Sequence, residues 1–345
     1  MLTALCAGAE TLRIATYNAD LTRRGPGLLL RDILSGTDAQ VAAVTGVIVA
    51  LDADLLLITG MDYDHGHAAL GALADTLAAL GAPYPYRFAL RPNTGVATGL
   101  DLDRNGRKGE ARDAQGYGRF AGAEGMALLS RLPVETGAAR DFSGYLWRDF
   151  PGALIPDGMT AEMLALQRLS TTGHWEVPVT LPGGGTLRLL AWHATPPVFD
   201  GPEDRNGRRN HDEAAFWLRL IDGELPMPPP EAPFVLLGDG NLDPADGDGR
   251  REAIAALLTH PKLQDAAPRG SHIRAYPGQT GDPALDTALF DEIGGLRLDY
   301  VLPGRDLRVV ASGVLWPPED DPLAAVLAQA SRHRPVWVDI ALPPP

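Results

Sequence analysis

The segment Phe234-Val-Leu-Leu-Gly-Asp-Gly-Asn241 is an apolar run that ends in alternating glycines and polar residues. A short apolar run bounded by glycine is typical of a strand that is buried on both faces of a sheet. Asp239 and Asn241 therefore follow a buried strand directly. Side chains at such strand ends, carried on loops, commonly build the functional site of a domain that mixes helices and strands.

Polar residues recur at the ends of other predicted buried strands, at Asn18, His193, Asp299 and His333. One such residue means little, because Asn and Asp routinely form turns. The whole set is more informative, since two imidazoles, two carboxylates and two amides can supply an acid, a base, orienting groups and contacts to an oxyanion or a metal. We therefore expect these side chains to form one site.

The rest of the chain alternates unevenly between helical and extended patterns. Apolar spacing predicts a helix that begins at Leu28 and further helices over residues 40–51, 68–80 and 213–221. Strands are predicted over residues 12–17, 54–58, 125–131, 169–179, 187–193, 296–302, 309–315 and 335–342. This order, without a clear linker or repeat, favours a single α/β domain over residues 10–345.

Composition limits the classes of function. The chain has 345 residues, of which 45% are apolar and 21% are charged, as in an ordinary globular protein. A net charge of −14 argues against a long duplex nucleic acid as the partner. Cys6 is the single cysteine, so no intramolecular disulfide can form. No apolar run reaches the ~20 residues that a membrane span needs.

The first nine residues, Met1-Leu-Thr-Ala-Leu-Cys-Ala-Gly-Ala9, allow two interpretations. The short apolar stretch before Ala-Gly-Ala is typical of the end of a signal peptide whose true start lies upstream. That interpretation predicts a secreted or periplasmic protein. The alternative is a frayed N-terminus on a cytoplasmic protein.

Six motifs occur in an order that resembles the endonuclease/exonuclease/phosphatase superfamily. They are Thr16-Tyr-Asn18, Gly125-Met-Ala-Leu-Leu-Ser-Arg131, Trp192-His-Ala-Thr-Pro196, Leu237-Gly-Asp-Gly-Asn241, Arg297-Leu-Asp-Tyr300 and Ser331-Arg-His-Arg334. The resemblance covers roughly residues 10–345 and implies the deoxyribonuclease I-like fold. That fold is a four-layered α/β sandwich of two packed, mostly antiparallel β-sheets that are flanked by helices.

The resemblance implies a pair of catalytic imidazoles. His193 and His333 would form this pair, one as the general base for water and the other as a general acid or phosphate donor. Asp299 would hold His333 in the working tautomer, as carboxylates do for other functional histidines.

The same resemblance assigns roles to three further residues. Asp239 would orient the attacking water, and Asn241 would bind a phosphate oxygen. Asn18 would contact the metal or the phosphate.

Two departures from the family pattern leave a degenerate metal site. The metal-binding Glu expected after Leu55-Leu-Leu-Ile-Thr59 is replaced by Gly60, and the Asp expected before the last His is replaced by Arg332. These changes make the site about three charge units more positive than in relatives. A guanidinium ~4 Å from a phosphate contributes roughly 4 kcal/mol at an effective dielectric of about 20. We therefore expect Arg332 to contact phosphate and to make catalytic magnesium weak or unnecessary.

A competing hypothesis keeps the metal in a displaced position. If the strand continues past Gly60, its period of two puts Asp62 on the same face, with Asp64 and His65 nearby as further ligands. The simpler interpretation of Met61-Asp-Tyr-Asp-His65 is a polar loop.

The segment Asp101-Leu-Asp103-Arg-Asn105-Gly106 matches the start of an EF-hand calcium loop, with oxygen ligands at alternate residues and glycine at the turn. The position of the final bidentate Glu holds Arg112, which excludes an ordinary EF-hand. Glu110 or Asp113 could substitute in a rearranged loop that binds Ca²⁺. The alternative is a solvated acidic turn.

The segment from Thr195 to Glu213 follows His193 and also has two interpretations. Its basic side chains could meet a substrate anion; they are Arg205, Arg208, Arg209 and His211. Alternatively, Asn210 caps the following helix together with Glu213, as in a capping box.

These features predict a phosphodiesterase or nuclease-like hydrolase that uses an activated water. We expect a small phosphodiester or a nucleotide-like substrate, and a monomer. The main alternative is a catalytically inactive relative that binds phosphate or another ligand, since both principal metal carboxylates are missing. A third hypothesis is an exported surface protein that is stabilised by calcium.

Overall fold

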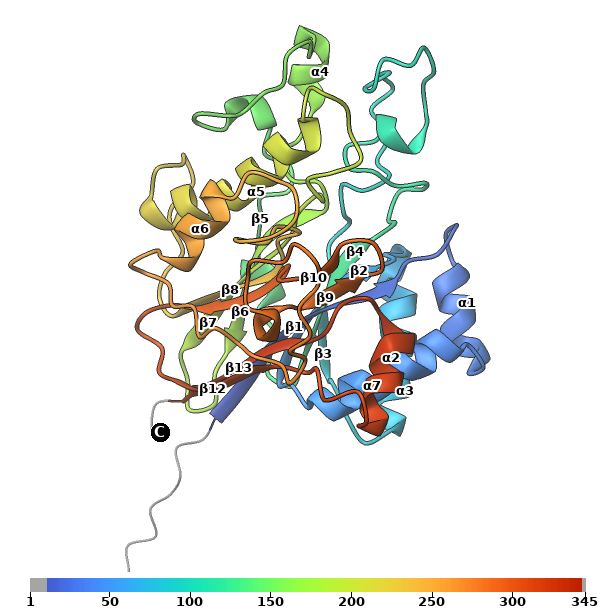
Figure 1. The fold of residues 1–345 in the computed structure, drawn as a ribbon, viewed down its shortest axis with the longest axis vertical. Helices are drawn as coiled ribbons and strands as arrows, with labels where there is room; N and C mark the ends of the chain where they lie inside the picture. The colour runs from blue at the N-terminus through green and yellow to red at the C-terminus, as the bar shows by residue number, and fades with distance from the viewer. Residues whose placement is uncertain (1–10, 343–345) are drawn as a thin grey trace, which may run out of the picture.

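The computed structural model describes residues 11–342, and two packed β-sheets form its centre (Figure 1). The first sheet has six strands in the spatial order β12 (Val309–Val314), β13 (Val336–Ala341), β1 (Thr11–Leu21), β2 (Leu55–Met61), β4 (Gly125–Ser130) and β3 (Tyr86–Phe88). The second has five strands in the order β11 (Asp299–Pro303), β8 (Phe234–Asp239), β7 (Thr186–His193), β6 (Gly173–Thr180) and β5 (Arg140–Asp141). A separate hairpin pairs β9 (Ala288–Phe290) with β10 (Gly294–Leu296).

Each sheet contains one parallel pair, β1 with β2 and β7 with β8, and its other neighbouring strands are antiparallel. This pairing explains where the polar residues of the motifs lie. Asp299 and His333 stand at or before the start of their strands, not at the end. Because β11 and β13 run antiparallel to β8 and β1, those starts lie at the same edge as the ends of β1, β7 and β8.

Alternating side chains along each strand separate the core into three layers. One apolar cluster lies between the sheets and draws on β1, β2, β4 and β13 from the first sheet and on β6, β7, β8 and β11 from the second. A second cluster covers the outer face of the first sheet, and a third covers the outer face of the second. The expected four-layered sandwich is therefore confirmed.

Helices supply the two outer layers (Figure 1). The first sheet is covered by α1 (Leu28–Ser35), α2 (Ala39–Leu51), α3 (Ala68–Ala79) and α7 (Pro322–Ala330). The second sheet is covered by α5 (Arg205–Asp222) and α6 (Glu252–Leu258), whereas α4 (Ala161–Leu166) is a short helix in the segment between β5 and β6. The short 3₁₀ helices are η1 (His65–His67), η2 (Ala111–Asp113), η3 (Thr136–Ala138), η4 (Trp147–Asp149) and η5 (Pro283–Leu285).

Most long apolar runs form the predicted elements, but the helix predicted over residues 213–221 begins at Arg205. The strand predicted over residues 296–302 divides into β10 and β11. The short strands β3, β5 and β9 and the helices α4, α6 and α7 were not predicted.

Within residues 11–342, no single helix is long and apolar enough to cross a membrane, although α1 and α2 pass that test together as a pair bent by 76°. The two interpretations of residues 1–9 concern a segment outside the described residues.

Candidate active site

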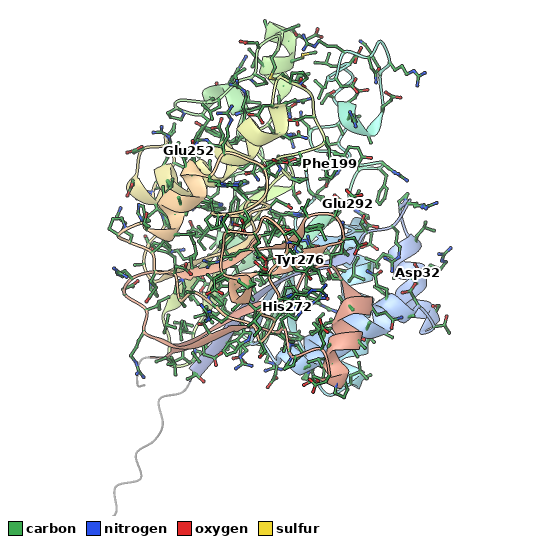
Figure 2. All side chains as sticks on the ribbon, viewed as in Figure 1. Asp32, Phe199, Glu252, His272, Tyr276 and Glu292 are labelled. Carbon is green, nitrogen blue, oxygen red and sulfur yellow. The ribbon has the colours of Figure 1, made fainter. Side chains whose placement is uncertain are left out.

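A cavity of about 970 Å³ opens at the sheet edge where the strand ends meet. Asn18, His193, Asn241, Arg332 and His333 all line it. The structure therefore brings together residues that lie far apart in the chain, as the motif analysis expected. The loop between β7 and α5 forms part of the rim, where the side chain of Phe199 is 78% exposed (Figure 2).

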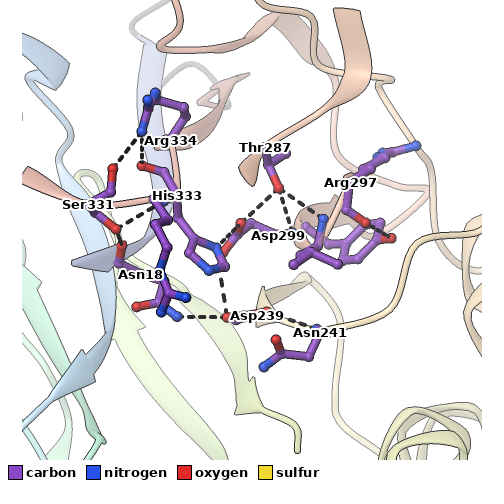
Figure 3. Close-up of polar contacts among 12 residues, drawn as sticks. Asn18, Asp239, Asn241, Thr287, Arg297, Asp299, Ser331, His333 and Arg334 are labelled. Atoms are coloured by element: carbon purple, nitrogen blue, oxygen red, sulfur yellow. Dashed lines mark hydrogen bonds and ion pairs between the residues drawn. The ribbon is translucent and has the colours of Figure 1, made fainter. Parts of the chain in front are cut away.

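Asp239 lies fully buried behind this cavity and connects three of its walls (Figure 3). Its Oδ2 accepts a hydrogen bond from Nδ2 of Asn18 at 2.8 Å, and its Oδ1 accepts one from the backbone N–H of Asn241 at 2.8 Å. His193 Nε2 lies 3.6 Å from the same Oδ2. The carboxylate thus fixes the relative positions of the β1, β7 and β8 ends.

His333 also lines the cavity, where Asp299 holds its imidazole (Figure 3). Nδ1 of His333 lies 2.8 Å from Oδ2 of Asp299, which also accepts a hydrogen bond from the Thr287 hydroxyl at 2.8 Å. The hydroxyl of Ser331 accepts from the backbone N–H of His333 at 3.0 Å and donates to the carbonyl of Asn18 at 2.7 Å. This arrangement directs Nδ1–H to Asp299 and leaves Nε2 for a ligand in the cavity.

The two imidazoles have pKa values that are shifted in opposite directions. Burial and, after it, the nearby positive charge of His333 lower the pKa of His193 to about 4, against smaller opposing contributions from Asp299 and Asp20. Burial also disfavours the charged form of His333, but the charge and hydrogen bond of Asp299 outweigh it and raise the pKa of His333 to about 9. At neutral pH His193 is therefore uncharged and His333 is protonated.

Gly60 has no room for a side chain. It adopts the left-handed backbone conformation, with φ at 66°, and a Cβ built on it would lie 2.3 Å from Oδ1 of Asn18. Asn18 thus occupies the space that a larger residue 60 would need.

Arg332 lines the cavity with a side chain that is 62% exposed, and its charge is paired. Its Nε lies 3.4 Å from Oδ2 of Asp20, and its guanidinium lies 5.4 Å from the centre of the Phe290 ring. Burial raises the pKa of Asp20, but His333 and Arg332 more than offset that effect, so the net shift is downward. Asp20 is therefore a carboxylate partner of Arg332.

Glu124 places a second unexpected carboxylate in the cavity wall. Among the residues that the structure describes, no hydrogen-bond donor or cation is within bonding distance of its side chain. Burial raises the pKa of Glu124, with further contributions from Asp20 and Asp62 and an opposing one from Arg332. That the site is about three charge units more positive than in relatives stays a prediction, but it left out the carboxyl groups of Asp20 and Glu124, which lie at the cavity with Arg332.

Neither carboxylate is among the residues expected from the motifs. Asp20 stands two residues after Asn18 in the same strand, and Glu124 directly precedes β4. Each is therefore a polar residue near a strand terminus, which is the pattern that located the other site residues. Asp20, Glu124 and Asn241 share positive φ angles, a conformation that is uncommon outside glycine, although Asp and Asn adopt it more readily than other residues, and that clusters at functional sites.

The carboxylate of Asp62 is engaged in hydrogen bonds within the protein. Its carboxylate accepts hydrogen bonds from the Thr22 hydroxyl at 2.8 Å, from the backbone N–H of Arg23 at 2.8 Å and from the backbone N–H of Glu124 at 3.2 Å. It does not line the cavity. This placement favours a role in connecting the loop after β1 to the start of β4, which agrees with the simpler interpretation as a polar loop more than with the competing hypothesis of a displaced metal.

The acidic loop after residue 100 gathers oxygen atoms of Asp101, Asp103 and Asp113 within 4.8 Å of one another. The carboxylate oxygens of Asp101 already accept hydrogen bonds from the backbone, one from Asn105 N–H at 3.1 Å and one from Gly106 N–H at 2.8 Å. The side-chain amide nitrogen of Asn105, not its oxygen, faces the carboxylate of Asp103 at 3.1 Å. A second cluster, Asp239, Asp299 and His333, belongs to the hydrogen-bonded network of the cavity.

Neither interpretation of residues 195–213 is correct in full. Asn210 and Glu213 lie inside α5 and are fully buried, so they do not form a capping box at its start. Of the basic side chains, Arg205 and Arg209 line the cavity, whereas Arg208 and His211 do not.

The sequence model of the "Endonuclease/Exonuclease/phosphatase family" matches residues 15–333. The chain belongs to this family. No curated protein matches the sequence.

Several solved structures are similar to the chain at the level of the fold. An endonuclease/exonuclease/phosphatase from Beutenbergia cavernae has a TM-score of 0.55 and 19% identity, with 96% of this chain and 72% of that chain covered. Sphingomyelinase C from Streptomyces griseocarneus has a TM-score of 0.52 and 17% identity, with 96% of this chain and 99% of that chain covered. The catalytic domain of human Nocturnin has a TM-score of 0.51 and 13% identity, with 96% of this chain and 94% of that chain covered.

Proposed function

We propose that the protein hydrolyses phosphate esters, with small phosphodiesters as its substrates. The observation that carries this proposal is the pair of imidazoles, His193 and His333, which border one cavity in opposite protonation states. Two titratable groups whose pKa values are driven apart are a common arrangement for acid and base catalysis. Membership of the family supports the same class of reaction.

In the proposed reaction a water molecule attacks phosphorus while the bond to the leaving oxygen breaks. His193 accepts a proton from the water. Asp239, whose Oδ2 lies 3.6 Å from His193 Nε2, orients the imidazole and would also orient the attacking water. His333 donates its proton from Nε2 to the leaving oxygen. Proton transfers of this kind typically contribute ~10²–10⁴-fold to the rate.

Phosphate oxygens would be held by Arg332 and Asn241. Arg332 is kept at the cavity wall by Asp20, and its guanidinium retains N–H groups beyond those that face Asp20. Asn241 uses one amide N–H on the carbonyl of Ala194 at 2.9 Å and has a second one for a phosphate oxygen. Fixed donors of this kind stabilise charge that develops in the transition state.

The cavity also offers ligands for the divalent metal ion that the family usually requires. Asn18, Glu124 and Asp20 provide hard oxygen donors, and the carboxylate of Glu124 is free of hydrogen bonds among the described residues. Mg²⁺ is commonly held by one or two carboxylates together with substrate phosphates, so this set fits. When bound, such an ion would neutralise charge on the phosphoryl group. Because the usual carboxylates at positions 60 and 332 are absent, we propose weak binding.

The size and charge of the protein support a compact substrate. A cavity of about 970 Å³ suits a ligand of nucleotide size, and the net charge of −14 disfavours a long duplex. We propose that the protein acts as a monomer. If an upstream signal peptide exists, the protein would act in the periplasm or outside the cell, and otherwise in the cytoplasm.

The second candidate function is a phosphate-binding module without catalysis, which Gly60 and Arg332 favour because they remove the principal metal carboxylates. Hydrolysis of bis(4-nitrophenyl) phosphate, measured with EDTA and with Mg²⁺, Mn²⁺ or Ca²⁺, separates the two functions. Turnover that disappears in His193→Ala and His333→Ala supports the hydrolase. Absence of turnover with every metal supports the binding module.

A further inference from the structure

The first half of α5 carries a set of buried polar side chains that the proposed reaction does not use. They are Arg209, Asn210, Asp212 and Glu213. Burying polar groups is unfavourable unless each finds hydrogen-bond partners. Their partners are mostly backbone groups of surrounding segments, so α5 connects these segments to one another.

Asn210 joins the loops that follow β7 and β8. Its side-chain Nδ2 donates to the carbonyl of Thr195 at 2.7 Å and to the carbonyl of Gly240 at 2.9 Å. Thr195 closely follows His193, and Gly240 stands between Asp239 and Asn241. One buried amide therefore contacts both loops that carry the proposed catalytic groups of the second sheet.

Glu213 holds the same loop from the next turn of the helix. Its Oε2 accepts the backbone N–H of Thr195 at 2.8 Å, and its Oε1 accepts the backbone N–H of Thr171. Both threonines line the cavity. Thr195 is thus fixed at its N–H by Glu213 and at its C=O by Asn210, which leaves the peptide chain after His193 little freedom.

We propose that Asn210 and Glu213 are positioning residues for the active site. They hold the backbone at Thr195 and Gly240, so that His193 and Asn241 keep their distances to Asp239. This inference rests on the proposed hydrolase function. It differs from a general role in stability, because the bonds of both residues converge on the two loops at the cavity.

Asp212 supplies a matched control within the same helix. It is as buried as Asn210 and Glu213, but it accepts hydrogen bonds from Trp147 Nε1 at 2.7 Å and from the backbone N–H of Leu154 at 2.7 Å. Neither Trp147 nor Leu154 lines the cavity. Loss of this contact should therefore affect stability without moving the catalytic loops.

The test compares two test variants, Asn210→Ala and Glu213→Gln, with the control Asp212→Asn. A second control, Trp147→Phe, also removes the hydrogen bond between Trp147 and Asp212, and it replaces Asp212→Asn if that variant does not fold. With bis(4-nitrophenyl) phosphate we expect the first two variants to lose at least tenfold in kcat with KM changed less than threefold. The controls should keep kcat within about threefold despite a lower Tm. Equal losses of kcat in test and control variants would overturn the inference.

NMR titration of ¹⁵N-labelled histidines provides a readout that does not depend on turnover. Looser loops admit water, so the pKa of His193 should rise from its depressed value toward the ordinary one in Asn210→Ala and Glu213→Gln, but not in the controls. An unchanged His193 titration in both test variants would refute the inference. If the wild-type protein shows no turnover, the hydrolase proposal fails, and this titration still decides whether α5 positions His193.

Discussion

His193 and His333 approach the same carboxylate oxygen from different sheets. Oδ2 of Asp239 lies 3.6 Å from Nε2 of His193, at the end of β7, and 4.0 Å from Nδ1 of His333, just before β13. Only His333 has a second carboxylate, Asp299, in hydrogen-bond contact. This asymmetry explains why one imidazole is protonated at neutral pH while the other is not.

Asp299 should control the alkaline limit of activity. His333 must be protonated to act as an acid, so kcat/KM should fall as the pH rises through its pKa of about 9. Asp299→Asn removes the negative charge that raises this pKa. The fall in kcat/KM at alkaline pH, the alkaline limb of the pH profile, should therefore move to lower pH, toward the ordinary histidine pKa of about 6.5. A pH profile of kcat/KM measures the shift.

Thr287→Val is the matched control for that profile, because it removes a hydrogen bond to Asp299 without changing any charge. It should shift the limb much less than Asp299→Asn. An alkaline limb that stays in place in Asp299→Asn would show that His333 is not the acid.

Arg332 should bind the substrate phosphate. Hydrogen bonds to a charged group contribute about 1.5–3 kcal/mol, so Arg332→Ala should lower kcat/KM by roughly 10- to 100-fold. Arg332→Lys should recover only part of the loss, since it keeps the charge but not the forked geometry. Strict dependence on magnesium together with full activity of Arg332→Ala would contradict this role.

Glu124 should be the main protein ligand of a divalent metal. Calorimetry with Mg²⁺ and Mn²⁺ should show at least tenfold weaker binding by Glu124→Gln than by the wild type. Asp75→Asn serves as the control, because this exposed carboxylate on α3 does not line the cavity, and it should leave this affinity unchanged. If Asp62→Ala weakened binding and Glu124→Gln did not, the displaced site at Asp62 would be correct instead.

Calcium binding by the loop at residues 101–113 stays a prediction. A bound ion would stabilise the folded state, so Ca²⁺ in excess over EDTA should raise the Tm of the wild type but not of Asp101→Asn/Asp103→Asn. A Tm that does not respond to calcium would remove the structural ion and, with it, the hypothesis of a calcium-stabilised surface protein.

The helices and strands that could be predicted are those whose apolar residues follow a regular spacing or an unbroken run. Runs such as residues 55–58 and 234–237 are apolar throughout, because both faces of their strands are buried between layers, and their strands were located closely. The start of α5 was placed too late, at Glu213, where its apolar spacing begins. Its first half is polar and buried, and no periodic rule identifies a helix whose inward side chains are Arg209 and Asn210.

The candidate site was predictable in the residues that converge but not in its charge. Motif order located His193, Asn241 and His333, which line one cavity, and Asp239, which lies buried behind it. Asp20 and Glu124 lie in segments about a hundred residues apart, and only tertiary structure brings them together beside Arg332. The charge of a site therefore could not be obtained by counting substitutions within motifs.

The proposed role of His193 and His333 is acid–base catalysis on a phosphodiester. Its most direct test measures kcat for bis(4-nitrophenyl) phosphate in the wild type, His193→Ala and His333→Ala, with each divalent metal at saturation. We predict turnover by the wild type and losses of about 10²–10⁴-fold in each variant, with folding confirmed by circular dichroism. Variants that fold and retain wild-type kcat would contradict the account.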